Sequence, residues 1–386
     1  MSNKENITKK ALLVTTVSGF VPQFEMQNVR ILQNMGYEIH YAANYTTPAY
    51  GYDNQRLNNT GIIQHQIDFE RKPFKFKNIK AFFQLCHLMK IEKYSLIHCH
   101  TPMGGVLARI TAHINRVAPI IYTAHGFHFY KGAPIKNWLF YYAAEKILSY
   151  FTDLLITINQ EDYFLAKKKF HARQIEYLPG VGINISKFSD THINKSEKRK
   201  ALGVLPTDIM LLSVGELIPR KNHELVIKAI KNINNHNIKY FICGKGEKEA
   251  YLSGLIQKLN LEKNVHLIGY REDIGELCQA SDLFVFPSLQ EGLSVALMEA
   301  IAAKTPVICS NIRGNTDLIK NPDSLFNPHS EESLCKCLRH ALERKMDGEV
   351  QTNYRRLKRF DEKNIIKSMN SIYDKALILP ISATDQ

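Results

Sequence analysis

Apolar and polar positions alternate along this chain with two different periodicities. Short runs rich in β-branched and aromatic residues predict strands, and the longer stretches between them, where apolar residues recur at helical spacing, predict helices. The predicted strands cover residues 11–17, 37–43, 61–69, 95–100, 119–123, 153–158 and 174–178, then 209–214, 239–243, 265–269, 282–287, 305–309 and 325–326. Strands that alternate with helices pair in parallel. The pattern therefore predicts an α/β protein with two parallel sheets.

A break in this alternation predicts a domain boundary. The pair Pro179–Gly180 is followed by the polar run 189–200, and linkers commonly have such a composition. At 386 residues the chain is also too long for one ordinary core. We therefore expect one Rossmann-like domain over residues 1–186 and a second over residues 187–361.

The stretch 288–306, with the sequence SLQEGLSVALMEAIAAKTP, carries the clearest sign of a site. It follows a predicted strand, and its first part forms a turn and a helix start at Glu291, Gly292, Leu293 and Ser294. Backbone N–H groups at a helix N-terminus favour an anion. The helix is apolar on nearly every face, yet it contains Glu299. A buried carboxylate must be neutralised, paired within the protein or turned towards a ligand's hydroxyls. Glu291 could instead be a solvated loop acid.

Other polar residues follow predicted strands in both halves of the chain. Arg220 and Lys221 precede a helix, so their charges and its N–H groups would converge on one anion, for which a diphosphate is the obvious fit. His125 lies in a glycine turn at a strand's carboxyl end, where parallel sheets bind ligands. The alternatives are loop cations in water and a turn histidine bonded to the backbone. His98 and His100 share one strand face. A metal pair is conceivable there, but no third ligand is apparent, and buried hydrogen-bonded histidines are the alternative.

Taken together, these patterns resemble retaining glycosyltransferases of family 4, which have the GT-B fold. The resemblance is carried by the Glu-x7-Glu segment from Glu291 to Glu299 and by the pattern Gly215-x4-Arg220-Lys221-x-His223. The stretches TAHGFHFYKGAP and LPGVGIN are similar to members that build bacterial capsule or exopolysaccharide. The resemblance extends over most of the chain. It implies two Rossmann-like parallel-sheet domains facing a central cleft, with a last helix at about 362–386 crossing back to the first domain.

The resemblance also implies roles for the candidate residues. Arg220 and Lys221 would hold the donor diphosphate, Glu299 its ribose, and Glu291 and His125 the sugar. Cations and N–H groups would stabilise the departing diphosphate, so that no metal or other cofactor is expected. The nearest imitation of an Asp-x-Asp metal motif is Asp68-x-Glu70, a weak competitor. The catalytic set is Glu291, His125, Arg220 and Lys221, and the remaining donor contacts are Gly19, Gly215, Gly244, Tyr270, Arg271, Gly292, Leu293 and Ser294.

The implied reaction is transfer of a sugar from a nucleotide diphosphate donor, a UDP-sugar, to a polyprenyl-diphosphate-linked saccharide. Retention of anomeric configuration follows from the resemblance alone. Two alternatives stay open: a nucleotide-sugar epimerase of the same architecture, and a non-catalytic nucleotide-sugar-binding partner in an assembly complex. The donor sugar, the choice between UDP and GDP, the acceptor and the oligomeric state are not fixed by the sequence.

The charge of the chain changes the expected partners. The net charge is +13, and residues 1–186 hold 21 Lys and Arg against 12 Asp and Glu, a net of +9. Such an excess suggests an anionic partner. Between residues 71 and 83, basic residues alternate with phenylalanines at positions 74, 76, 82 and 83, a composition that suits an anionic membrane surface. The alternative is a solvated basic loop and a helix whose aromatic residues face the core. No nucleic-acid-binding motif is recognisable.

Two further features bear on location. The apolar run 11–17 is too short for a signal-peptide core, and no segment has 18 uninterrupted apolar residues. We expect a cytoplasmic protein associated peripherally with the inner face of the plasma membrane. The seven cysteines are scattered and odd in number, which indicates core thiols rather than disulfides or a zinc knuckle.

Overall fold

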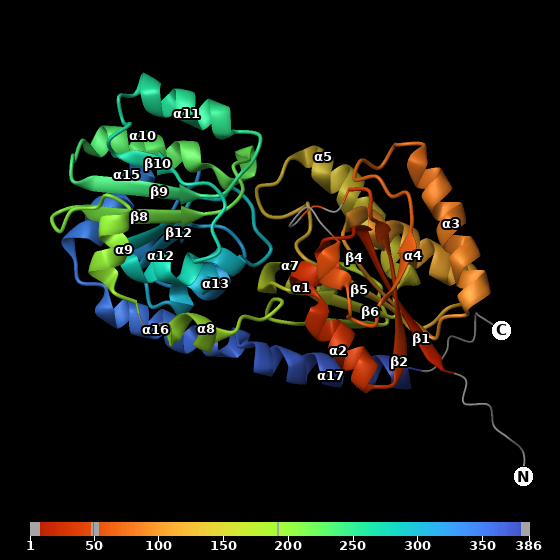
Figure 1. Cartoon of the computed structure of the whole chain (residues 1–386). Coiled ribbons are helices and arrows are strands. Elements are labelled where there is room, and N and C mark those ends of the chain that lie inside the picture. The colour runs from red at the N-terminus through yellow and green to blue at the C-terminus, as the bar shows by residue number, and fades with distance from the viewer. Residues whose placement is uncertain (1–7, 48, 50–53, 191–192, 380–386) are drawn as a thin grey trace, which may run out of the picture. The chain divides into compact units, whose positions relative to one another are not determined.

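The computed structural model of the chain describes residues 8–47, 49, 54–190 and 193–379 (Figure 1). Its contacts divide the chain into two compact units. Unit 1 runs to Val181 and resumes at Lys363, and unit 2 is the continuous segment Gly182–Glu362. The sequence places the division at residues 186/187, within the helix Ile185–Ser189.

Unit 1 is built on a seven-stranded sheet with the order β3-β2-β1-β4-β5-β6-β7. Every pairing in it is parallel. Its strands are β1 Lys9–Val17, β2 Tyr37–Asn44, β3 Ile63–Gln66, β4 Leu96–His100, β5 Ile120–Ala124, β6 Leu154–Thr157 and β7 Gln174–Tyr177. The predicted fold class is thereby confirmed for the first half of the chain.

The helices of unit 1 cover both faces of this sheet. They are α1 Phe20–Phe24, α2 Met26–Asn34, α3 Lys77–Glu92, α4 Pro102–Ile114, α5 Ile135–Asn137, α6 Ala143–Leu148 and α7 Gln160–Lys169, with the short turns η1 Gln55–Leu57, η2 Trp138–Tyr142 and η3 Ser149–Phe151. The sequence predicts one helix over residues 24–35, whereas the chain breaks between α1 and α2 at Glu25, which has φ −123° and ψ 7°. This break places the Glu25 side chain at the edge of the sheet.

The period of two along β1 separates two apolar layers. Leu12 and Val14 point into the layer that contains α3 and α4, and Ala11 and Leu13 point into the opposite layer. The opposite layer is completed by α17, Glu362–Ile378, through Ile365, Met369, Ile372, Tyr373 and Ala376. The last helix therefore returns to the first unit, as predicted. The part of that prediction beyond residue 379 lies outside the described residues.

Unit 2 repeats the architecture with a six-stranded sheet of order β10-β9-β8-β11-β12-β13, again parallel throughout. Its strands are β8 Ile209–Val214, β9 Ile238–Cys243, β10 Val265–Leu267, β11 Leu283–Phe286, β12 Val307–Ser310 and β13 Leu325–Phe326. Its helices are α8 Ile185–Ser189, α9 Lys195–Ala201, α10 His223–Ile233, α11 Glu249–Lys258, α12 Ile274–Ala280, α13 Val295–Ala302, α14 Asn315–Leu318, α15 Glu331–Glu343 and α16 Asp347–Leu357, with the turns η4 Pro219–Lys221, η5 Pro322–Ser324 and η6 Lys358–Phe360.

Both sheets reverse their strand order at the same place. The order runs back from the first strand to the third on one side, and forward from the fourth strand on the other. The carboxyl ends of the first and fourth strands therefore flank a switch point, where open parallel sheets bind ligands. In unit 1 this point lies between β1 and β4, and in unit 2 it lies between β8 and β11. Within the described residues, no helix has the length and apolar character needed to cross a bilayer.

Candidate functional sites at the two switch points

The switch point of unit 2 brings together three of the predicted site residues. Nη1 of Arg220 lies 2.8 Å from Oε1 of Glu291, and Nζ of Lys221 lies 2.7 Å from the same oxygen. Arg220 and Lys221 follow β8, and Glu291 follows β11, so neighbouring strands carry the opposite charges to one edge. Two cations thus converge on one oxygen of one carboxylate.

Backbone bonds hold the two loops of this cluster together. The N–H of Leu289 donates to the carbonyl oxygen of Arg220 at 2.8 Å, and Arg220 Nη1 donates to the carbonyl oxygen of Gln290 at 2.8 Å. The Lys221 ammonium also lies 5.0 Å from the centre of the Phe286 ring, at the end of β11. The cations are therefore fixed by both loops.

The charge state of Glu291 follows from this setting. Burial opposes ionisation, but Lys221 and Arg220 outweigh it and hold the pKa of Glu291 below its ordinary value. The carboxylate is therefore ionised at neutral pH, and the cluster keeps one net positive charge. An anionic ligand would be attracted to that remaining charge.

Glu299 lies on α13 and stands in a different environment. Burial raises its pKa to about 7, and Lys187 on α8 offsets only part of that effect. Within the described part of the chain, its carboxylate has no hydrogen bond or ion pair. Of the three possibilities that the sequence leaves for Glu299, internal pairing is thus not observed. Partial neutralisation and contact with a ligand remain.

The turn before α13 is formed as the sequence predicts. The sequence predicts a helix from Leu293, whereas α13 begins two residues later, at Val295. Ser294 is the N-cap residue, and its hydroxyl accepts the N–H of Leu297 at 3.3 Å. Gly314 packs against this turn and has no room for a side chain, because a Cβ there would lie 2.2 Å from the carbonyl oxygen of Gly292. The N–H groups of Leu293 and Ser294 precede the helix rather than belong to it.

Two predicted donor-binding glycines pack against each other beside the cluster. A Cβ on Gly244 would lie 1.9 Å from the carbonyl oxygen of Gly215, and Gly244 has φ +154°. A Cβ on Gly215 would lie 3.2 Å from Cδ of Lys221. Glycine at position 215 therefore leaves space for the lysine stem, and glycine at 244 lets the loops after β8 and β9 touch.

The predicted base-contact residues follow β10. The Tyr270 side chain is 70% exposed, so its ring is accessible. Arg271 instead forms a two-pronged pair with Asp273, in which Nε donates to Oδ1 at 2.8 Å and Nη2 to Oδ2 at 2.5 Å. Lys198 on α9 binds the same carboxylate. The guanidinium of Arg271 is thus already occupied by a neighbouring acid.

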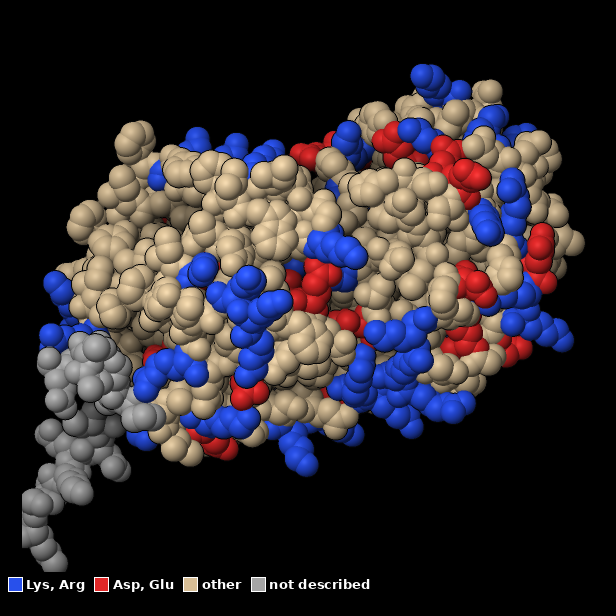
Figure 2. Space-filling view, turned by 180° about the vertical axis from the view of Figure 1, so that it is seen from behind, with Lys and Arg blue, Asp and Glu red and all other residues tan. Residues whose placement is uncertain are grey.

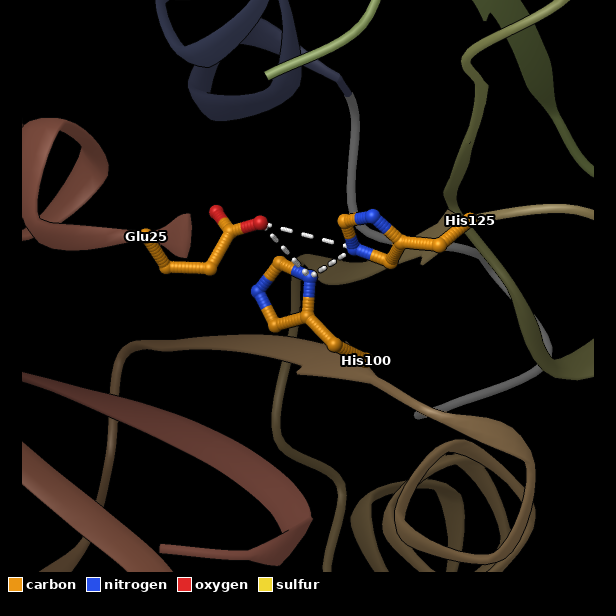
Figure 3. Close-up of side chains that lie close together, drawn as sticks. All are labelled: Glu25, His100 and His125. Atoms are coloured by element: carbon orange, nitrogen blue, oxygen red, sulfur yellow. Dashed lines mark hydrogen bonds and ion pairs between the residues drawn. The ribbon is translucent and has the colours of Figure 1, made fainter. Parts of the chain in front are cut away.

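The switch point of unit 1 holds His125 in a cluster that the sequence does not indicate. Nε2 of His125 lies 3.2 Å from Nδ1 of His100, and Oε1 of Glu25 lies 3.4 Å from the first atom and 3.7 Å from the second (Figure 3). Glu25 comes from the break after α1, His100 from the end of β4 and His125 from the loop after β5. Gly19, the remaining predicted contact, is the N-cap residue of α1.

Burial shapes the ionisation of this cluster. It lowers the pKa of His125 to about 4 and that of His100 well below its ordinary value, so both imidazoles are neutral at pH 7. It also raises the pKa of Glu25 to about 8, against the effect of the Asn28 amide that binds its other oxygen. The cluster therefore contains no cation of its own.

His98 is a buried, hydrogen-bonded core histidine, which is the alternative to a metal ligand given in the sequence analysis. Its Nδ1 lies 2.7 Å from the Tyr373 hydroxyl on α17, and its Nε2 lies 2.8 Å from Oγ1 of Thr123. His100, by contrast, lies beside two other polar side chains, those of His125 and Glu25. The sequence does not indicate Glu25 as a partner, because it lies 75 positions away at a helix break that contains no glycine. The two acids of the Asp68-x-Glu70 motif each form an ion pair with a lysine: Asp68 pairs with Lys80, and Glu70 pairs with Lys77.

Comparisons with known proteins agree with this architecture. Residues 9–159 match the family model described as glycosyl transferase 4-like, and residues 194–359 match the model described as glycosyl transferases group 1. The chain is 35% identical to the putative glycosyltransferase EpsD of Bacillus subtilis, over 83% of each chain. It is 31% identical, over 94% of each, to an Escherichia coli enzyme named UDP-Gal:alpha-D-GlcNAc-diphosphoundecaprenol alpha-1,3-galactosyltransferase.

Solved structures show the same fold at lower identity. The structure of Anabaena HepE in complex with UDP-glucose has a TM-score of 0.76 and 18% identity, and covers 95% of this chain and 99% of its own. The structure of WaaG, a glycosyltransferase involved in lipopolysaccharide biosynthesis, has a TM-score of 0.72 and 19% identity, and covers 94% and 99%.

Proposed function

We propose, from the premise that the chain belongs to the family 4 glycosyltransferases with the GT-B fold, that it transfers a sugar from a UDP-sugar to a polyprenyl-diphosphate-linked saccharide and retains the anomeric configuration. Unit 2 is the donor-binding domain and unit 1 the acceptor-side domain in this proposal. The named glycosyltransferases among the relatives favour transfer over epimerisation or binding alone.

One observation carries the donor assignment: Arg220 and Lys221 converge on a single oxygen of Glu291. The carboxylate pairs with both cations and keeps their side chains in place. A diphosphate, which carries more negative charge, would compete for them, and Glu291 would then be released towards the sugar. As the bond to the sugar breaks, charge accumulates on the diphosphate, and fixed cations stabilise that change. No metal ion is needed for this step.

The positions of the side chains support roles for the remaining residues proposed to contact the donor. Glu299 is free to accept the ribose hydroxyls, since no other described residue binds its carboxylate. Tyr270 is exposed and could stack on the base, whereas Arg271 would first have to leave Asp273. The donor would also contact the backbone directly at four places: Gly19, Gly215, Gly244 and the turn from Gly292 to Ser294. We assign His125, at the switch point of unit 1, to contact with the sugar.

The acceptor and the membrane are proposed from a relative and from the surface of unit 1. The E. coli relative is named for a diphosphoundecaprenol-linked substrate. In unit 1, Phe74 is 93% exposed, Phe76 is 88% exposed and Phe83 is 65% exposed, while Phe82 packs against the core. Lysines and arginines predominate over acids on the face in Figure 2. Exposed phenylalanines between cations suit an anionic membrane surface, and we place the protein at the cytoplasmic face.

A thermal-shift panel of nucleotide sugars tests this function. The proposed donor should raise the melting temperature in proportion to the logarithm of its concentration over its dissociation constant. The stabilising sugar nucleotide is then incubated with a polyprenyl-diphosphate-linked saccharide, and the product's anomeric configuration is read by NMR. Turnover of the donor without acceptor to an isomeric sugar nucleotide would reveal an epimerase instead. Binding without turnover across a panel of acceptors would leave only the non-catalytic partner.

A further inference from the structure

We infer that Glu25, His100 and His125 bind a divalent transition-metal ion. The three ligand atoms are Oε1 of Glu25, Nδ1 of His100 and Nε2 of His125, and all three point into the same space (Figure 3). The inference goes beyond the proposed glycosyl transfer and does not depend on it. It also departs from the prediction that the chain has no metal site.

The distances between the three atoms favour a shared ion over direct hydrogen bonds. They are 3.2, 3.4 and 3.7 Å. Hydrogen bonds from ring nitrogens are usually about 2.7–3.2 Å long, so two of the three separations exceed that range. Ligands in a tetrahedral zinc site, with bonds of about 2.0–2.1 Å, lie roughly 3.3–3.4 Å from each other. The triangle of side chains therefore has the dimensions of three corners of such a site.

The ligand types indicate which metals would fit. Two imidazoles and one carboxylate are a common set for Zn²⁺ at sites with an open position, and they also suit Fe²⁺. Mg²⁺ and Ca²⁺ prefer sites made of oxygen ligands. The site should thus discriminate for a transition metal, and Zn²⁺ is the natural first probe.

Burial and neighbouring contacts support the assignment. The side chains of Glu25 and His100 are 3% and 0% exposed, and His125 is 20% exposed. The Asn28 amide donates to Oε2 of Glu25, which turns Oε1 towards the histidines. The two imidazole nitrogens and the carboxylate oxygen thus lie together in a largely enclosed place, which limits competition from water for a bound ion.

The site would have one coordination position open to a ligand. Three protein ligands leave a fourth position in tetrahedral geometry. Glu25 and His125 line a small cavity, together with Thr123, Gly180 and Met369. A water molecule or a ligand hydroxyl reaching this cavity could take the open position. A bound ion would occupy Nε2 of His125 and leave only its Nδ1 for direct contact with a sugar.

Metal titration of the full-length protein tests the inference. Chelator-stripped protein should bind about one Zn²⁺ per chain in competition with a chromophoric chelator, and the ion should raise the melting temperature. Glu25→Gln should weaken Zn²⁺ at least about 100-fold, because loss of a direct ligand exceeds the 10–100-fold effect of losing an outer-shell partner. His100→Ala should do the same. Circular dichroism verifies that both variants are folded.

A second histidine pair gives the matched control. Nδ1 of His40 lies 2.8 Å from Nε2 of His65, but Glu38 binds the opposite nitrogen of His40, so these groups do not converge. His65→Ala should therefore bind Zn²⁺ as the parent does. Absorption of the Co²⁺-loaded protein should show tetrahedral nitrogen and oxygen ligation without thiolate bands. Absence of binding, equal binding by Glu25→Gln, or thiolate ligation would overturn the inference and leave a hydrogen-bonded cluster.

Discussion

The ammonium of Lys221 and the carboxylate of Glu291 form a buried ion pair, 2.7 Å long, with side chains that are 12% and 10% exposed. The pair joins the loop after β8 to the loop after β11, and Arg220 shares its acceptor oxygen. The two cations that we propose for the donor diphosphate are therefore held by an internal anion. In the proposed function, a diphosphate displaces this contact, which fixes the positions of the two cations.

Replacing Lys221 should abolish transfer and leave the fold intact. Lys221→Ala removes one of two cations that would meet the departing diphosphate, and we expect kcat/KM to fall by about 100-fold or more. Arg220 still neutralises Glu291, so circular dichroism should stay native. Lys228→Ala is the control, because Lys228 forms its ion pair with Glu224 on the same helix, away from Glu291. Normal turnover by the purified Lys221→Ala protein would remove this residue from the mechanism.

Glu299 should couple donor affinity to pH. Its pKa in the folded chain is raised to about 7, so the ionised form that accepts ribose hydroxyls increases as pH rises through that value. UDP-sugar affinity should rise from pH 6 to pH 8 in the parent protein. In Glu299→Gln it should be weaker by at least about tenfold, the loss expected for one hydrogen bond to a charged group, and flat over this range. Isothermal titration calorimetry at three pH values measures both, and a flat parent profile would contradict the assignment.

The same residue should lower the stability of the free protein. An acid whose pKa is raised on folding binds more protons when folded, so its stabilising contribution is lost as pH rises from about 4.5 to about 7. Glu299→Gln should match the parent near pH 4. At pH 8 it should be more stable by about 1 kcal/mol, a value reduced for the partial exposure of the side chain. Denaturant unfolding of both proteins tests this, and a less stable Gln variant at pH 8 would refute it.

Gly244 should tolerate no side chain. In Gly244→Ala the new Cβ would meet the carbonyl oxygen of Gly215 at 1.9 Å, so the loops after β8 and β9 must separate. We expect a loss of roughly 1–3 kcal/mol in stability and weaker UDP binding. Gly254→Ala is the matched control, since its Cβ meets nothing within 4 Å inside α11, and it should gain about 0.5–1 kcal/mol. Equal melting temperatures for the two variants would show that the loops are not constrained as described.

The exposed phenylalanines of unit 1 should control membrane binding. Phe74→Ser/Phe76→Ser removes two exposed rings beside Lys72, Lys75 and Lys77, and pelleting with anionic liposomes should fall by about tenfold or more. Phe164→Ser, which removes a 65% exposed ring from α7, should pellet normally. Binding of the parent should weaken as salt rises. Salt-independent pelleting, or unchanged pelleting of the double variant, would count against this surface.

Local patterns predict most of the strands and the turn before α13, because β-branched runs and glycine turns act within a few residues. Two features at the sites depend on distant contacts instead. The pairing of Lys221 with Glu291 follows from β8 lying beside β11, and a strand order of this kind is not encoded in the residues next to either side chain. The sequence indicates both residues but not that they bind each other.

The cluster in unit 1 was harder to predict for the same reason. Glu25 lies in a segment that fits one continuous helix, and glutamate is a good helix former, so nothing local signals the break. His100 and His125 come from adjacent strands, and only the parallel register of β4 and β5 brings their ring nitrogens together. The donor, sugar and base roles of all the candidate residues stay predictions.

The return of α17 to the first sheet bears on the order in which the chain matures during synthesis. Gly182–Glu362 is continuous, so unit 2 can close its core as soon as its own last residue has emerged. The first unit is translated earlier, yet it lacks Ile365, Met369 and Ile372 until the ribosome has almost finished. Part of one apolar side of the first sheet therefore stays uncovered while unit 2 folds, and a nascent chain arrested before residue 363 should attract chaperones there.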